Sequence, residues 1–227
     1  MKPKIAFILV MIVTIACGAS EVPQVDLDYT PLFDRFMSEA TREEASDAAT
    51  AELRTRLPEF RMSWANEGPK LLKAAMDLTD RPFKFAETRA ALVVSRVPSL
   101  SHPLIISMPE FLRAVRGDRA QPDEIFVDAV FHEILHRYIA DILGQRETIL
   151  LKKYSAETIV VRNHLHLFAL QEQAYEELGM NDVFERAVAA EKQLKGATAF
   201  ARAREIVKIE GASAFVSELK KTGKPNP

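Results

Sequence analysis

Apolar residues recur at helical spacing along most of the chain. After a start signal at Thr30-Pro31, the pattern runs to Leu57, where Pro58 interrupts it, and it resumes with a further break near Gly68-Pro69. Beyond residue 108 the same spacing predicts six helices, over 109–115, 122–143, 155–178, 181–194, 198–209 and 213–221. Glycines at 144, 179, 196 and 211 stand where helix ends are expected.

A different pattern separates the two helical regions. Residues 84–97 are rich in apolar and β-branched side chains, with a strand predicted over 91–94, a turn over 98–103 and a second strand over 104–108. Two short strands favour a small sheet, either a hairpin or part of a meander. Glu21 to Tyr29, ahead of the first helix, is interpreted as a tether. The predicted fold class is mainly α with a small β-sheet (α+β).

The first nineteen residues differ from the rest of the chain in their order of charged, apolar and small residues. Lys2 and Lys4 precede an apolar run over 5–15, and small residues follow at 16–20. This order is typical of a secretory signal peptide, and the run is shorter than the ~20 residues that a membrane span needs. We therefore expect a signal peptide over 1–19 and a single exported domain over 20–227, periplasmic or secreted.

Cys17 is the only cysteine of the chain. Residues 14–18 resemble a bacterial lipobox, whose cysteine becomes the lipidated N-terminus, although Thr14 stands where leucine is usual. Two outcomes stay open: a lipoprotein tethered to the membrane through Cys17, or cleavage after Ala19. In both cases the mature domain has neither a disulfide nor a thiol nucleophile.

Composition and charge exclude several classes of protein. With 227 residues, 48% apolar and 27% charged, the chain has the composition of a folded soluble domain rather than a disordered or collagen-like one. A net charge of -2 predicts no nucleic-acid partner. Neither a Gly-rich phosphate loop nor a G-x-S-x-G elbow occurs. The candidate catalytic and metal-binding residues therefore lie in one short motif.

That motif is His132-Glu133-Ile134-Leu135-His136, within the helix predicted over 122–143. Residues four apart share a helix face, so both imidazoles can bind one metal ion. Glu133 projects about 100° away, where it can take a proton from metal-bound water and pass it to a leaving group. Zinc, as a single ion, suits two histidines with a third N or O ligand and one open position.

A chance occurrence of the motif would leave Glu133 and Arg137 as an ordinary surface ion pair. The other residues on the histidine face argue against chance, because they are apolar: Ile125, Ala129, Ile139 and Leu143. Two histidines buried there without a partner would cost free energy. The sequence therefore predicts a metal site.

The motif and the strands upstream of it resemble the zincin metallopeptidases. The resemblance implies a zincin-like fold, with the H-E-x-x-H helix packed on a second ligand-bearing helix and a strand edge that aligns a peptide. Arg137 departs from the family, which usually has an uncharged residue there. Ile139 and Ile142 stand where the metzincin branch has its glycine and third histidine.

The third ligand is expected on the helix after the motif helix, packed antiparallel to it. Counting outward from Gly144 places His164 level with His136 and makes it the best geometric fit. Glu157 is the rival, since it lies 21 residues after His136, close to the spacing of the glutamate in gluzincins, another zincin branch. His166 and Glu172 remain as further alternatives.

Two functions follow from these predictions. The first is an exported zinc metallopeptidase that hydrolyses peptide or protein substrates, with metal ligands His132, His136 and His164 and with Glu133 as the catalytic base and acid. The second is a non-catalytic helical envelope protein or lipoprotein, whose metal site is structural or decayed and which acts as a binding or scaffolding module. Metal analysis of the purified protein distinguishes the two.

Overall fold

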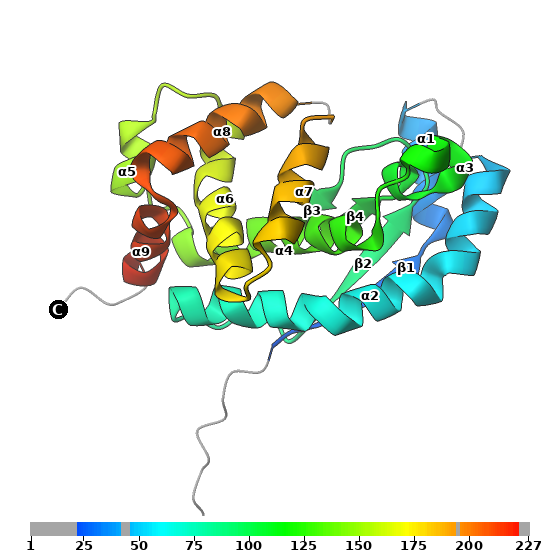
Figure 1. The fold of residues 1–227 in the computed structure, drawn as a ribbon, viewed down its shortest axis with the longest axis horizontal. Helices are drawn as coiled ribbons and strands as arrows, with labels where there is room; N and C mark the ends of the chain where they lie inside the picture. The colour runs from blue at the N-terminus through cyan, green and yellow to red at the C-terminus, as the bar shows by residue number, and fades with distance from the viewer. Residues whose placement is uncertain (1–21, 42–45, 194–195, 223–227) are drawn as a thin grey trace, which may run out of the picture.

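A computed structural model describes residues 22–41, 46–193 and 196–222 (Figure 1). In chain order the elements are β1 (Gln24–Tyr29), α1 (Pro31–Thr41), α2 (Asp47–Thr79), β2 (Glu87–Val93), β3 (Leu100–Ser101), β4 (Leu104–Ser107), α3 (Arg113–Arg116), α4 (Asp123–Leu143), α5 (Ile149–Lys153), α6 (Ile159–Glu177), α7 (Asn181–Glu191), α8 (Ala197–Glu210) and α9 (Ala212–Thr222). Helices dominate and the sheet is small, which confirms the predicted α+β class. The predicted signal peptide and Cys17 lie outside the described residues.

The sheet has four strands in the order β1-β2-β4-β3. β1 pairs with β2 in parallel, from Gln24 opposite Glu87 to Tyr29 opposite Leu92, and β2 pairs with β4 in parallel. Only β3 and β4 form a hairpin. The two predicted strands are therefore parallel neighbours rather than a hairpin, and the predicted tether is instead the strand β1.

Side-chain alternation along β2 divides the sheet into two faces. Ala90 and Leu92 join the main hydrophobic core. Ala91 and Val93 belong to a second, smaller cluster on the other face, against which Met37 of α1 packs. β2 is thus buried on both faces, as an inner strand of a parallel sheet should be.

Helix α2 is a single helix of 33 residues that continues through Pro58 and Pro69. The predicted helix breaks at these prolines are therefore wrong. A proline inside a helix costs about 3 kcal/mol, because it removes a backbone hydrogen bond and its ring clashes with the preceding turn. Large buried side chains on both sides of Pro58 and Pro69 offset that cost: Leu53, Phe60, Trp64, Leu71 and Leu72.

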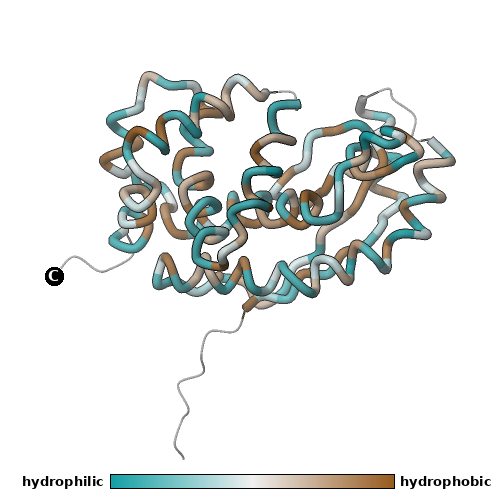
Figure 2. Tube along the Cα trace, in the orientation of Figure 1, coloured by the Kyte–Doolittle hydropathy of each residue, from teal (hydrophilic) through white to brown (hydrophobic). Residues whose placement is uncertain are grey.

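Helix α4 lies at the centre of the molecule, with the sheet to its right and α5, α6, α8 and α9 to its left in Figure 1. It packs against β3 and β4 on one side and against α6 on the other, while α2 contacts both α4 and α6. Helices α8 and α9 cover α6. Figure 2 shows hydrophobic positions gathered where these elements meet. The motif helix is thereby held between the sheet and the C-terminal helices.

The helices after the sheet follow their predicted positions closely, with small shifts at the ends. The stretch predicted as one helix over 109–115 is divided into a 3₁₀ helix, Pro109–Phe111, and α3. The helix predicted from residue 155 begins at Ile159, after the short helix α5, which the pattern did not predict.

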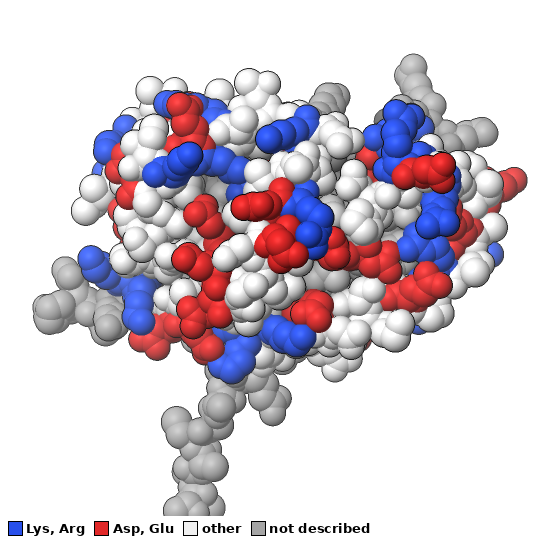
Figure 3. Space-filling model, in the orientation of Figure 1, with Lys and Arg blue, Asp and Glu red and all other residues white. Residues whose placement is uncertain are grey.

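Charges of both signs are interspersed on the face seen in Figure 3. Many of them are paired, as in Arg186 with Glu124 and Asp182. None of the helices in the described ranges combines the length and hydropathy that crossing a bilayer requires.

Candidate metal site

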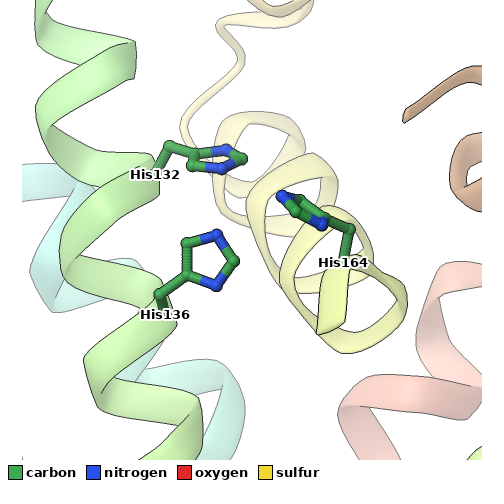
Figure 4. Close-up of side chains that lie close together, drawn as sticks. All are labelled: His132, His136 and His164. Atoms are coloured by element: carbon green, nitrogen blue, oxygen red, sulfur yellow. The ribbon is translucent and has the colours of Figure 1, made fainter. Parts of the chain in front are cut away.

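Two of the three candidate ligands lie on α4. Asp123 and Glu124 occupy its first turn, where acidic side chains favour the helix dipole, and Gly144 follows its end with φ 56°. His132 and His136 are one turn apart and point towards α6 (Figure 4), with ring centroids 4.9 Å apart. The motif is therefore helical, with both imidazoles on one face, as the spacing predicted.

The third candidate ligand, His164, lies in the second turn of α6. This helix begins after Thr158, whose side chain accepts a hydrogen bond from the Val161 backbone N–H. The His164 ring is centred 5.4 Å from that of His132 and 4.8 Å from that of His136. One ring nitrogen from each histidine lies within 4.8 Å of the other two, so the three together could hold a metal ion. The prediction that His164 joins the motif histidines agrees with this geometry.

A backbone contact determines which nitrogen of His164 is free. Nδ1 lies 2.6 Å from the Val160 carbonyl oxygen, and because a carbonyl only accepts, Nδ1 carries the proton. In the neutral ring Nε2 then keeps its lone pair and faces the other two histidines (Figure 4). This arrangement prepares His164 to bind a metal through Nε2.

All three histidines are held in the neutral form, which is the form that binds metals. Burial lowers the pKa of His132 well below its usual range, and the neighbouring His136 and His164 lower it further. Burial also lowers the pKa of His136, to about 4, with a further contribution from His164. The pKa of His164 is lowered by burial too, against the opposing effect of its bond to Val160.

Glu133 is partly buried and has no partner within residues 22–41, 46–193 and 196–222. Burial alone raises the pKa of its carboxyl group to about 7. The described residues give it no hydrogen bond or ion pair. Arg137, the residue expected to pair with it if the motif were ordinary helix surface, instead stacks on Phe85 with 3.9 Å between Cζ and the ring centroid. The surface ion-pair interpretation of the motif therefore does not hold.

The rival third ligands lie elsewhere. Glu157 precedes α6 and accepts two hydrogen bonds from Arg202 of α8, at 2.9 and 2.7 Å. His166 is 1% exposed, and its Nε2 lies 2.9 Å from a carboxylate oxygen of Glu218, so it links α6 to α9. Glu172 is absent from the histidine cluster. None of the three contributes to that cluster.

Aromatic rings surround the cluster on the α8 side. Phe200 of α8 is centred 4.7 Å from the His164 ring and 6.5 Å from the His132 ring. Phe168, one turn beyond His164, is centred 5.1 Å from His164 and 5.8 Å from His132. Apolar walls of this kind exclude water and keep the imidazoles neutral.

Two buried polar residues near His132 were not predicted from the sequence. Asp128 lies one turn before His132 on α4, and Gln171 lies on α6 with no exposed surface. The Gln171 amide donates a hydrogen bond of 2.7 Å to the Asp128 carboxylate. The interval of four residues between Asp128 and His132 was the only available signal, and it does not by itself distinguish a buried carboxylate from an exposed one.

The three histidines fit a tetrahedral metal with modest adjustment. Zinc–nitrogen bonds of about 2.0–2.1 Å place two ligand nitrogens roughly 3.4 Å apart. The ligand atoms here lie within 4.8 Å of one another, so small rotations of the side chains bring them to that spacing. Among the described residues, no further His, Cys, Asp or Glu joins the three.

Comparison with known proteins adds no family assignment. No family model matches the sequence, and neither the curated proteins nor the solved structures give a significant match.

Proposed function

We propose that this chain is a zinc-dependent metallopeptidase, in which His132, His136 and His164 bind one zinc ion and Glu133 is the general base and acid. One observation carries the proposal: three neutral histidines from two helices converge, and the residue next to one of them is a carboxylic acid that has no partner in the described part of the chain. Zinc bound by three protein ligands supplies a water of pKa about 7 and polarises a substrate carbonyl.

Glu133 would move the protons of the reaction. It projects from the same helix as the two motif histidines, about 100° around the axis from His132. Since none of the described residues places a cation or donor on its carboxylate, Glu133 can accept a proton from the attacking water and deliver it to the leaving amine. Glu133 thus acts as the general base when water attacks and as the general acid when the amine leaves.

The order of the elements supports this function. A sheet, the motif helix and a second helix that brings the third ligand are the arrangement that the resemblance to zincins implies. β3 is the outer strand on the side of the sheet that contacts α4, and Leu100 is 40% exposed there. An extended peptide pairing with this edge would pass close to the motif helix.

The number of ligands favours catalysis over a purely structural site. Structural zinc sites are usually closed by four protein ligands, whereas catalytic sites have three and an open position. In the described part of the chain only three potential ligands gather. The alternative of a scaffolding protein with a structural or decayed site lacks this support.

The test compares purified wild-type protein with Glu133→Gln, with Glu177→Gln as a matched control at an exposed position of α6. Zinc content and cleavage of a library of quenched fluorescent peptides are measured for each. We expect one zinc per chain in all three and cleavage by the wild type and Glu177→Gln only. Retained cleavage by Glu133→Gln contradicts the role of Glu133. Wild-type protein that binds no zinc, or binds it and cleaves no peptide, contradicts the proposed function.

A further inference from the structure

Helix α6 presents one face to His132, and His164 is only the first member of this face. His164, Phe168 and Gln171 are spaced by four and three residues, so they share a side of the helix. The rings of the first two are centred 5.4 and 5.8 Å from His132. Gln171 continues this face by one turn and neighbours His132 as well.

The two ends of the Gln171 side chain have different surroundings. Its amide nitrogen donates to Asp128 Oδ1 at 2.7 Å, and both residues are buried, with 0% and 6% exposure. Its amide oxygen is also buried and completes no hydrogen bond in the structure. A buried amide oxygen without a donor costs free energy. A nearby donor that can satisfy it is a ring N–H of His132.

Asp128 fixes the direction in which Gln171 points. A glutamine amide can be rotated by 180° with little change in shape, which would exchange its oxygen and nitrogen. The Asp128 carboxyl group accepts the hydrogen bond from the nitrogen, so the oxygen is turned away from Asp128. Asp128 and His132 lie one turn apart on α4, so Gln171 can reach both from α6.

The geometry points to Gln171 as a positioning residue for the metal site: its amide oxygen accepts the proton of one His132 ring nitrogen, Asp128 fixes the amide, and the other ring nitrogen is presented to the metal. The inference rests on the proposed metal site and deepens it. A metal-binding histidine commonly donates its second N–H to a carbonyl or carboxylate, which fixes the tautomer and the ring orientation. For His164 the Val160 carbonyl serves this purpose, and for His132 it is Gln171.

The test uses the full chain with Gln171→Leu, which removes the acceptor, and Gln171→Glu, which keeps an acceptor oxygen. Gln173→Leu makes the same substitution two positions along α6 and serves as the matched control. Zinc affinity is measured by competition with a chromophoric chelator, and the thermal unfolding of each metal-free variant is recorded. We expect Gln171→Leu to lose 10- to 100-fold in zinc affinity and Gln173→Leu to stay within a few-fold of wild type. Gln171→Glu, which keeps the acceptor oxygen but loses the donor to Asp128, should lose less affinity than Gln171→Leu. Unchanged affinity in Gln171→Leu, or an equal loss in Gln173→Leu, overturns the inference.

A second readout depends on neither the metal nor the folding of a variant. The ¹⁵N chemical shifts of the His132 ring in metal-free wild-type protein report its tautomer directly. We expect a single tautomer with a slowly exchanging ring N–H, and a mixture of tautomers overturns the inference. If wild-type protein shows the single tautomer but binds no zinc, the proposed function fails while the contact between Gln171 and His132 stands.

Discussion

Asp128 is 6% exposed, and its environment favours the neutral form of its carboxyl group. Burial and, to a smaller extent, Glu191 of α7 raise its pKa to about 7, against the opposing effects of Gln171, Tyr175 and Arg204. This pKa lies above the ordinary value of 3.8 for an aspartate. Between these two pH values Asp128 therefore keeps its proton in the folded protein and loses it in the unfolded chain. The contribution of Asp128 to stability is therefore greatest at low pH and is lost as the pH rises towards 7.

Asp128→Asn should remove this pH dependence while keeping an acceptor for Gln171. The stability of the variant relative to wild type should increase by roughly 2–3 kcal/mol between pH 5 and pH 8, because each pKa unit corresponds to about 1.4 kcal/mol. Urea unfolding of both metal-free proteins at the two pH values measures the difference. A constant difference between pH 5 and pH 8 would show that Asp128 titrates normally.

At the residue scale, the sequence predicted what spacing alone determines. An interval of four places His132 and His136 on one face in any helix, and counting from Gly144 brought His164 level with them. Gln171 could not be found in this way, because a glutamine in a helix is usually exposed. Its role depends on burial between α4 and α6, which no local pattern contains.

At the scale of the element, α2 shows a close contact between Gly68 and Trp64. A Cβ on Gly68 would lie 2.5 Å from two atoms of the buried indole ring. In an ordinary helix Gly→Ala stabilises by about 1 kcal/mol, but here the added methyl group overlaps the buried ring of Trp64, so the ring or the helix must shift. The effect of the substitution should therefore have the opposite sign.

We expect Gly68→Ala to destabilise the protein by about 1–3 kcal/mol in urea or thermal unfolding. Asn66→Ala, at an exposed position of the same turn, should be neutral or slightly stabilising through helix propensity. A Gly68→Ala variant more stable than wild type would mean that Trp64 moves aside without cost.

The errors in predicting elements have different causes. Polar and apolar residues alternate through β1, with Val25 and Leu27 buried, so the local strand signal was present in the sequence, whereas the pairing with β2 was not. Pro58 and Pro69 looked like breaks because the local cost of proline is known, whereas the burial of Phe60 and Trp64 that offsets it depends on tertiary packing. The α4 and α6 helices were predictable because strong periodicity and clear end signals coincide in them.

At the scale of the whole molecule, the histidine cluster joins two halves of the fold. His132 and His136 belong to α4, which contacts the sheet, and His164 belongs to α6, which α8 and α9 cover. A metal that binds the folded cluster and not the unfolded chain stabilises the fold as a whole by mass action. The change in stability therefore reports whether one ion links both helices.

Zinc at about 100 times its dissociation constant should stabilise the protein by about 2.7 kcal/mol, which for a chain of this size raises the melting temperature by roughly 5–10 °C. Calorimetry with zinc and with a chelator measures the shift. His164→Ala should remove most of it, because the two α4 histidines alone hold zinc weakly, while His102→Ala, at an exposed turn, should retain it in full. An equal shift in His164→Ala would place the ion on α4 alone and remove the link between the two helices.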